Sequence, residues 1–270
     1  MPSPAARTIA ASGRWGTVPL SPTGAARAGS PPARYNSRVA TDERLERLPP
    51  RDLLPGGGPT VPGDFLGRMQ QLTRALAYDP SSWTDEARRF IVELFDERAP
   101  TWHARGSEEN RAPLADALAR GQVAPGGACV EIGSGTGLHT PALEAHFDEV
   151  VSVEISPEML AMTPPGTAHL LLADAARLPL AAGSVTAVVC VNAFLFAAEY
   201  ARVLRPDGAL VFVSTSGEDT PIYLPPDDVV AAFRRVSAGR EATTSRAVRG
   251  TWTVVRHPTG TDHRARRPPG

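Results

Sequence analysis

Five largely apolar runs recur through the middle of the chain, at residues 128–132, 149–154, 168–173, 185–191 and 208–214. The runs are continuously apolar rather than alternating, which is typical of strands that are covered on both faces. Stretches with helical periodicity separate them. This alternation favours a parallel sheet with helices on both faces and right-handed crossovers.

The pattern changes after the fifth run. Residues 227–237 have the spacing of an amphipathic helix, and residues 241–248 and 251–256 are two strand-like segments that meet at Arg249-Gly250. A two-residue connection of this kind is suited to a hairpin. We therefore predict an α/β fold, with a doubly wound, seven-stranded and mostly parallel sheet that ends in an antiparallel C-terminal hairpin.

Composition divides the chain into segments. The opening is rich in Pro, Gly, Ala, Ser and Arg, and its first acidic residue is Asp42. We therefore predict that residues 1–62 are a disordered extension. Residues 63–122 are expected to form a helical lid segment, residues 123–257 the ligand-binding domain, and residues 258–270 a disordered tail.

Charge and cysteine content argue against several classes of protein. The formal net charge is −1, with 28 cationic side chains that are all arginine. A nucleic-acid-binding protein usually presents a basic face, so we expect no nucleic-acid partner. No run approaches the length of a membrane span, so we expect no membrane partner, and no metal site is predicted. Cys129 and Cys190 are interpreted as buried small hydrophobes in a reducing compartment, which favours a cytoplasmic protein.

The strongest candidate for chemistry is the segment VEIGSGTG at residues 130–137. Glycine tolerates positive φ angles and, lacking a Cβ, lets main-chain amides approach a ligand. Glu154 ends the next apolar run, 21 residues after Gly133. A carboxylate in that position can accept two hydrogen bonds from ribose hydroxyls. The pairing indicates a nucleoside-containing cofactor.

Two details bear on the kind of cofactor. Leu138 stands where the GxGxxG motif of dinucleotide-binding proteins has its third glycine, and Glu131 lies two residues before the first glycine. A carboxylate there suits an ammonium or sulfonium group better than a diphosphate, because like charges repel in a partly desolvated site. The alternative is that the glycines only make a turn between a strand and a helix.

Four further segments follow in order: VVSVEIS at 150–156, LLLADAARLPL at 170–180, VVCVNAF at 188–194 and ARVLRPDGALVFVS at 201–214. Together with the glycine segment they resemble the class I S-adenosylmethionine-dependent methyltransferases, particularly the small-molecule branch similar to ubiquinone and menaquinone C-methyltransferases. The resemblance covers about residues 90–256. It implies a Rossmann-like methyltransferase fold, S-adenosyl-L-methionine as the cofactor and a small molecule as the methyl acceptor.

The resemblance also implies roles for individual residues. It places the glycine turn under the methionine part of the cofactor and Glu131 near its amino group. It implies that Glu154 binds both ribose hydroxyls and that Asp174 accepts a hydrogen bond from the exocyclic amine of adenine. The cofactor-binding residues that it implies are Glu131, Gly133, Ser134, Gly135, Gly137, Glu154, Ile155, Met159, Asp174, Ala175, Asn192 and Ala193.

Several of these residues have a structural alternative. Glu154 is also suited to be an ordinary strand-end acid, with Ser156 and Pro157 starting a helix. Asp174 could cap the turn that follows it, since aspartate favours such local hydrogen bonds. Met159 could simply fill a gap in the core.

The expected reaction depends mainly on orienting the acceptor atom behind the methyl group, because the methyl group of a sulfonium is already electrophilic. A general base is required only for some acceptors, and His139 and His103 are weak candidates for that role. Trp102 is a candidate lid over the cofactor. The candidate walls of an acceptor pocket are Phe194, Phe196 and Tyr223.

Two departures from the family pattern keep other functions open. The segment between Asn192 and Tyr200 is short, and Pro206-Asp207-Gly208 replaces the familiar Pro-Gly-Gly. The shortened segment favours a non-catalytic cofactor-binding module as an alternative to an active methyltransferase. A nicotinamide-dependent oxidoreductase is less favoured, because the glycine spacing differs and a chain without lysine cannot hold a Tyr-x-x-x-Lys pair.

Overall fold

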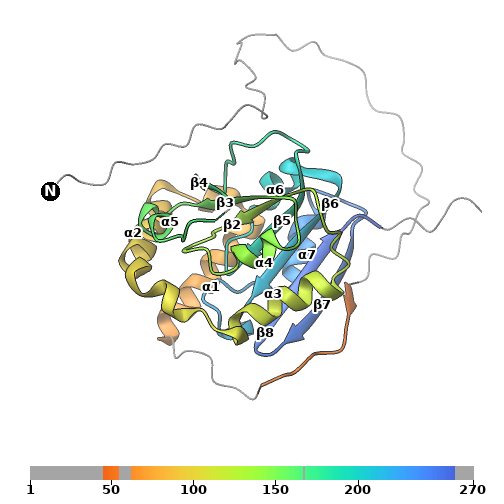
Figure 1. The fold of residues 1–270 in the computed structure, drawn as a ribbon, viewed down its shortest axis with the longest axis horizontal. Coiled ribbons are helices and arrows are strands. Elements are labelled where there is room, and N and C mark those ends of the chain that lie inside the picture. The colour runs from red at the N-terminus through yellow and green to blue at the C-terminus, as the bar shows by residue number, and fades with distance from the viewer. Residues whose placement is uncertain (1–44, 55–61, 167, 259–270) are drawn as a thin grey trace, which may run out of the picture. The chain divides into compact units, whose positions relative to one another are not determined.

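The five apolar runs form the parallel centre of one sheet in the computed structural model, which describes residues 45–54, 62–166 and 168–258. Across these residues the sheet has eight strands in the order β1-β7-β8-β6-β5-β2-β3-β4, and only β8 runs antiparallel to its neighbours. The strands are β1 (Leu45–Arg47), β2 (Ala128–Ile132), β3 (Glu149–Glu154), β4 (His169–Leu172), β5 (Val185–Val191), β6 (Leu204–Ser214), β7 (Glu241–Ala247) and β8 (Gly250–Arg256). The predicted α/β class with a mostly parallel, Rossmann-like sheet is confirmed (Figure 1).

The observed bounds of β2, β3 and β5 agree with the apolar runs that predicted them. The strand predicted at 208–214 begins earlier, at Leu204. Leu204 pairs with Val185 and Ala209 pairs with Ala187, so residues 205–208 of β6 form a bulge opposite residue 186 of β5. Such a bulge carries no apolar signal, so the sequence pattern marks only the regular part of the strand.

One strand comes from the segment that we expected to be disordered. Leu45–Arg47 pairs in parallel with β7, and Arg51 forms an isolated bridge to Ala247. The edge of β7 is thereby covered, which satisfies its main-chain groups. The predicted extension is therefore wrong for residues 45–54, and the sheet has eight strands rather than seven. The rest of the predicted extension and tail, apart from Pro62 and Pro258, lies outside the described residues.

The C-terminal hairpin turns one residue earlier than predicted. Gly250 is paired with Ala247, so the two connecting residues are Val248 and Arg249 rather than Arg249 and Gly250. Position 250 in β8 requires glycine, because an added Cβ would lie 2.4 Å from Cγ of Pro113. Val248 takes the turn instead, with φ of 54°, a conformation that is unfavourable for a β-branched residue.

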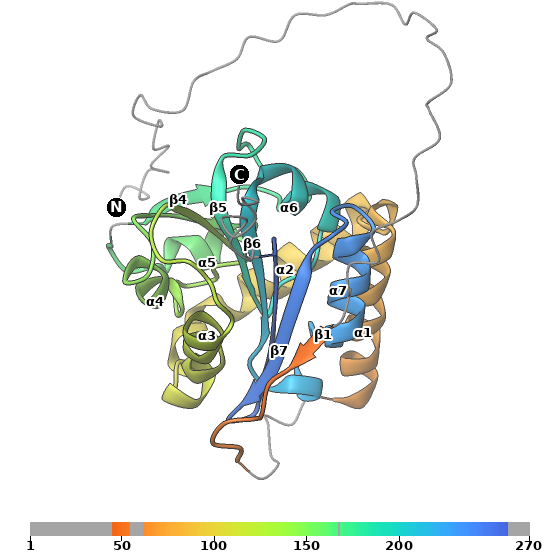
Figure 2. The ribbon, with the colours of Figure 1, turned by 90° about the vertical axis from the view of Figure 1, so that its right-hand side faces the viewer.

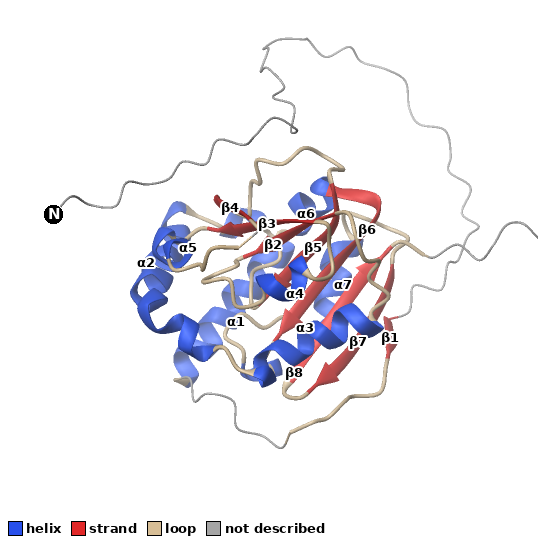
Figure 3. Cartoon of the chain, viewed as in Figure 1, coloured by secondary structure: helices blue, strands red, loops and turns tan. Residues whose placement is uncertain are grey.

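Helices cover both faces of the sheet (Figures 2 and 3). On one face, α3 and α4 contribute to a core with β2, β5, β6 and β8. On the other, α1, α2, α6 and α7 pack against the same central strands. The helices are α1 (Gly63–Tyr78), α2 (Asp85–Trp102), α3 (Glu108–Arg120), α4 (Thr140–Glu144), α5 (Pro157–Ala161), α6 (Ala197–Val203) and α7 (Pro226–Arg234), with short 3-10 turns η1 (Pro80–Ser82), η2 (His103–Arg105) and η3 (Gly217–Asp219). The helix predicted at 227–237 is thus α7 and ends three residues earlier.

The two cysteines are free and buried. They lie in the neighbouring strands β2 and β5, but Cys129 faces one core and Cys190 the other. None of the described helices combines the length and apolar character needed to cross a bilayer. Within the same part of the chain, no group of three His, Cys, Asp or Glu side chains is placed to hold a metal ion.

Candidate functional site

Four strands bring the predicted residues to one edge of the sheet. β2 lies between β3 and β5, and β4 lies beyond β3. Ile132 at the end of β2 is level with Val153 and with Cys190, while Glu154 is level with Leu172. Because these strands are parallel, their carboxyl ends meet at one side. The crevice outside such ends is where open α/β sheets bind their ligands.

The glycine turn follows β2 in a conformation that suits glycine. Gly133, Gly135 and Gly137 have φ angles of 64°, 57° and 78°. A Cβ added at Gly135 would lie 3.3 Å from Nε1 of Trp102, so this indole lies close to the turn. The hydroxyl of Ser134 is buried and has no hydrogen-bond partner among the described residues. The turn therefore presents a bare main chain and an unused polar group.

Glu154 at the end of β3 holds the glycine turn in place. One carboxylate oxygen accepts the main-chain N–H of Gly135 at 2.8 Å. The other oxygen accepts the N–H groups of Ile155 and Ser156, each at 2.8 Å. Burial raises the pKa of Glu154, although these three donors act in the opposite direction. A carboxylate has about four acceptor positions, so one position stays available to a ligand hydroxyl.

Glu131 is buried beneath the turn with 2% of its surface exposed. Its Oε2 atom accepts hydrogen bonds from the hydroxyls of Thr140 at 2.7 Å and Ser152 at 2.8 Å. Burial raises the pKa of Glu131 from 4.5 to about 7, against the effect of the two hydroxyls and together with the nearby Glu154 and Glu144 carboxylates. A cation bound beside Glu131 would favour its charged form, which suits the ammonium group expected there.

Asp174 follows β4 and is already engaged by the protein. Its Oδ1 atom accepts the N–H of Ala176 at 2.9 Å, which is the local turn that we considered as the alternative role. Nε1 of Trp83 donates to both carboxylate oxygens, at 3.1 Å to Oδ1 and 3.0 Å to Oδ2. Ala175 lies within this turn and packs against the core. The carboxylate that the resemblance assigns to adenine thus holds an indole in this structure.

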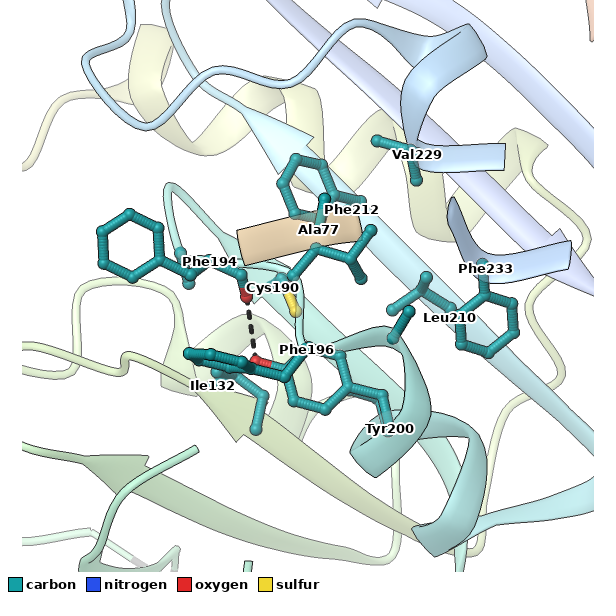
Figure 4. Packing of buried hydrophobic residues seen from close by; sticks show 14 of the residues in the cluster. Ala77, Ile132, Cys190, Phe194, Phe196, Tyr200, Leu210, Phe212, Val229 and Phe233 are labelled. Carbon is teal, nitrogen blue, oxygen red and sulfur yellow. Dashed lines mark hydrogen bonds between the residues drawn. The ribbon is translucent and has the colours of Figure 1, made fainter. Parts of the chain in front are cut away.

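The segment after β5 is fixed by packing. The Tyr200 hydroxyl donates to the carbonyl oxygen of Phe194 at 2.9 Å, as the dashed line in Figure 4 shows. Tyr200 is fully buried, and Phe194 and Phe196 are 7% and 4% exposed. Both phenylalanine rings contact Trp83, with ring centroids 5.6 Å and 5.5 Å away. The short segment is therefore an ordered wall of the crevice.

Asn192 opens this segment in the left-handed region, with φ of 52°. Its side chain exchanges two hydrogen bonds with Thr215 after β6: its Nδ2 donates to Oγ1, and its Oδ1 accepts the main-chain N–H, both at 2.9 Å. Ala193 is buried, and its Cβ lies 3.1 Å from where a Cβ on Gly133 would be. Asn192 thus links the end of β5 to the end of β6, and its side-chain amide is occupied by these two hydrogen bonds.

Two of the predicted residues, Ile155 and Met159, lie at the start of α5. The Ser156 hydroxyl caps the helix by accepting the N–H of Met159 at 3.0 Å, and it donates to Oδ1 of Asp96 at 2.5 Å. Met159 is 1% exposed and fills the core beneath the helix. Ile155 is partly buried against the same core. The contact with Asp96 docks α2 onto this end of the crevice.

The two histidines differ in their surroundings. His103 is exposed, and its Nδ1 lies 3.3 Å from the hydroxyl of Thr136 in the glycine turn. His139 lies at the start of α4, and its Nδ1 is buried with no partner among the described residues. Burial, together with the charge of Arg111, lowers the pKa of His139 to about 4. Such an imidazole is a weak base at neutral pH, so His139 is poorly suited to the role of general base, whereas His103 lies beside the glycine turn.

The three aromatic residues predicted to be walls of an acceptor pocket lie in two different surroundings. Tyr223 lines a cavity of about 490 Å³ whose walls include Arg47 of β1, Arg246 of β7 and the 3-10 turn η3. Phe194 and Phe196 are absent from its walls and pack around Trp83 instead. Phe194 and Phe196 thus lie in the wall of the crevice and Tyr223 lines this cavity, and their role as walls of an acceptor pocket stays a prediction.

Sequence reasoning missed three residues that shape this edge. Ser152 carried a signal, since it is the single hydroxyl within the apolar run of β3, and its partner is Glu131. Thr140 had no such signal. Trp83 had none either, because it lies 91 residues before the carboxylate that it binds.

Comparisons with known proteins identify a domain in the segment that contains this edge. Residues 130–212 match the family model of a methyltransferase domain. No curated protein matched the sequence. A methyltransferase from Haloferax volcanii, solved with the Trm112 methyltransferase activator, is 21% identical, with coverage of 61% of this chain and 97% of its own and a TM-score of 0.48. A possible histamine N-methyltransferase from Thermotoga maritima is 18% identical, with coverage of 61% and 98% and a TM-score of 0.47.

A third solved structure contains the cofactor product. The phosphoethanolamine N-methyltransferase 1 of Haemonchus contortus, with phosphoethanolamine and S-adenosylhomocysteine, is 16% identical, with coverage of 69% of this chain and 52% of its own and a TM-score of 0.44. The domain is identified by the matched segment, residues 130–212. That segment runs from β2 to β6 and contains the glycine turn, Glu154, Asp174 and Asn192. The match identifies residues 130–212 as a methyltransferase domain, which indicates an enzyme with S-adenosylmethionine as its cofactor.

Proposed function

We propose that this chain transfers the methyl group of S-adenosylmethionine to a small-molecule acceptor by in-line displacement. The observation that carries the proposal is the pair of buried carboxylates, Glu131 and Glu154, on either side of a bare glycine turn. Among the described residues no basic side chain is bonded to either acid. Two such buried acids suit a ligand that brings its own positive charge and its own hydroxyl donors.

The residues present fit the cofactor at several points. Glu131 suits the ammonium group, Glu154 has an acceptor position for ribose, and the hydroxyl of Ser134 is an unused donor for a carboxylate. Gly135 leaves space that a side chain would fill, at a turn in close reach of Trp102. When bound, the cofactor supplies an electrophilic methyl group, which leaves sulfur as a thioether while the acceptor forms the new bond and gives up a proton.

The protein's contribution in this proposal is orientation and exclusion of water. The glycine turn is held by Glu154, and α2 is held over the crevice by the bond between Asp96 and Ser156. Well-oriented reactants can save about 7 to 11 kcal/mol of the barrier, so positioning alone is a sufficient contribution. His103, near Thr136, is the residue best placed to take a proton from an acidic acceptor.

The acceptor class is supported by the motif order, which is similar to that of ubiquinone and menaquinone C-methyltransferases, and by the near-neutral charge of the chain. The 490 Å³ cavity that Tyr223 lines is a candidate for the part of the acceptor away from the methyl group. Buried thiols at Cys129 and Cys190, on opposite faces and unpaired, support a reducing cytoplasmic setting.

Calorimetric titration with S-adenosylhomocysteine and with NAD tests the cofactor. We expect binding of S-adenosylhomocysteine only, and loss of that binding in Glu154→Gln, which keeps the shape of the side chain but removes its charge. Glu158→Gln, an exposed acid on α5, is the matched control and should bind normally. Binding of NAD in place of S-adenosylhomocysteine would favour an oxidoreductase and contradict the proposal.

A non-catalytic cofactor-binding module is the second candidate. It is favoured by the short segment after Asn192, whose two phenylalanine rings are buried rather than turned towards a ligand. The two functions differ in one measurement: transfer of a labelled methyl group from S-adenosylmethionine to compounds in a cell extract. Incorporation that disappears in Glu154→Gln supports the enzyme, and cofactor binding without incorporation across varied extracts supports the module.

A further inference from the structure

The most unusual feature of the crevice is a tryptophan that is hydrogen-bonded to Asp174, the acid that the resemblance assigns to adenine. Nε1 of Trp83 lies 3.1 Å and 3.0 Å from the two carboxylate oxygens of Asp174. Hydrogen bonds to a charged acceptor are stronger than neutral ones. The carboxylate also accepts the N–H of Ala176, so most of its acceptor capacity towards the crevice is used.

The ring of Trp83 is held as well as its N–H group. Phe194 meets it at 5.6 Å with planes inclined by 57°, and Phe196 at 5.5 Å with planes inclined by 64°. Trp83 therefore places a flat aromatic ring between two others and points an N–H donor at a carboxylate. A purine with an exocyclic amine offers the same combination of a flat ring and an N–H donor.

The other end of the crevice is also approached by the same segment of chain. Trp102 lies over Gly135, and His103 contacts Thr136. These residues belong to α2 and η2, while Trp83 lies in the connection between η1 and α2. One continuous segment, residues 79–105, thus contacts both the acid of β4 and the glycine turn of β2.

We propose that Trp83 is an internal competitor of the cofactor's adenine ring, and that it must leave Asp174 before adenine can bind. The inference depends on the proposed function, because it assigns adenine to Asp174. In this arrangement the protein holds its adenine site closed with its own side chain, and the cofactor replaces one N–H donor by another. The apparent affinity is then reduced by the fraction of molecules in which Trp83 is bound.

The construction of the segment allows Trp83 to move without undocking α2. Trp83 is partly exposed and stands between two helix caps: Asp79 accepts the N–H of Ser81 at 3.0 Å, and Thr84 accepts that of Ala87 at 3.2 Å. The bond from Ser156 to Asp96 anchors α2 independently of Trp83. In this proposal a rotation of the Trp83 side chain releases the indole from Asp174 while the Thr84 cap and the Asp96 bond hold α2 in place.

A fixed wall of the adenine site would have the opposite consequence. If Trp83 stacked on bound adenine, its removal would weaken binding, because base–aromatic stacking is favourable. If Trp83 competes with adenine, its removal strengthens binding. The sign of the change in affinity separates the two roles.

The experiment is calorimetric titration of S-adenosylhomocysteine into the full chain and into Trp83→Phe and Trp83→Ala. Trp83→Phe keeps a ring between Phe194 and Phe196 but lacks the donor for Asp174. We expect both variants to bind at least about tenfold more tightly than the unaltered protein, a factor that corresponds to about 1.4 kcal/mol. Phe90→Ala, which removes a 47% exposed ring from α2, is the matched control and should leave affinity unchanged.

The outcomes distinguish this inference from the function on which it depends. Equal or weaker binding by both Trp83 variants, with normal binding by the unaltered protein, overturns the competitor role and leaves the cofactor assignment standing. Absence of binding by all of the proteins overturns both.

Tryptophan fluorescence gives a second measurement. Adenosine alone should change the emission of the unaltered protein and leave that of Trp83→Phe nearly constant, while methionine alone should have no effect on the Trp83 signal. An adenosine-induced change of the same size in Trp83→Phe and in the unaltered protein would show that Trp83 does not respond to adenosine, and would contradict its displacement.

Discussion

The main-chain N–H of Gly135 donates to the carboxylate of Glu154 at 2.8 Å, which ties the turn after β2 to the end of β3. Two motifs that are separate in the sequence are therefore one structural unit. Glu154 has a structural role in shaping the turn in addition to the ligand role that we propose for it.

Replacing Glu154 by alanine should consequently affect more than cofactor affinity. Three buried or partly buried N–H groups would lose their acceptor, and each unsatisfied donor costs about 1 to 3 kcal/mol. We expect Glu154→Ala to unfold at lower denaturant concentration than the unaltered protein, and Glu154→Gln to lose less stability because it keeps an acceptor oxygen. Equilibrium denaturation measures both, and equal stability of the three proteins would contradict the role in the turn.

Gly135 is the position in the turn where a side chain should be most harmful to binding. It has φ of 57°, and an added Cβ would meet the Trp102 indole at 3.3 Å. We expect Gly135→Val to abolish binding of S-adenosylhomocysteine in calorimetry, because a β-branched residue strains the backbone and fills the turn. Gly183→Val, at a glycine with φ of 62° and open surroundings, controls for backbone strain alone and should retain binding.

The raised pKa of Glu131 predicts a pH dependence of stability. Its pKa is about 7 in the folded protein and 4.5 ordinarily, so between these values the folded state holds more protons than the unfolded state. The stabilising contribution is complete below pH 4.5 and is lost as the pH rises through 7, by an amount on the order of 3 kcal/mol.

Glu131→Gln removes this titration. The difference in unfolding free energy between the unaltered protein and this variant should shift in favour of the variant from pH 5 to pH 8, as measured by denaturation at each pH. Glu149→Gln, an exposed acid on β3, should show no comparable shift. A pH-independent difference for Glu131→Gln would mean that the carboxyl group titrates normally.

A second buried acid, Asp116 on α3, should be important for stability alone. It accepts the indole N–H of the fully buried Trp252 at 2.7 Å and is paired with Arg120. Burial acts to raise the pKa of Asp116, but the bonds from Arg120 and Trp252 outweigh it and hold the pKa below its ordinary value. The stabilisation is present at neutral pH and is lost as the pH falls through the lowered pKa.

Asp116→Ala leaves Trp252 and Arg120 without their shared acceptor. Breaking a buried pair in this way costs about 3 to 5 kcal/mol, and we expect a loss near the lower value because Arg120 is partly exposed. Asp64→Ala, which breaks the exposed pair with Arg68, should change the free energy of unfolding by less than about 1 kcal/mol. Similar losses in the two variants would contradict the importance of burial here.

Much of the sheet and of its functional edge could be predicted from sequence, because the signals are local. The runs that became β2, β3 and β5 are apolar along their whole length, since both of their faces are covered, and their ends are marked by glycine, an acid or asparagine. Glu131, Glu154 and Asp174 reach one edge because parallel strands bring their carboxyl ends together.

Only the tertiary structure decided which partners these residues have. The strand at 45–47 has no apolar pattern and exists because the edge of β7 needs main-chain partners. Thr140 and Ser152 meet at one oxygen of Glu131 only when α4 and β3 pack against β2. Trp83 reaches Asp174 across 91 residues because α1 and α2 place their connection over the ends of β4 and β5. Contacts of this kind depend on three-dimensional packing rather than on neighbours in the chain, so no local pattern marks them.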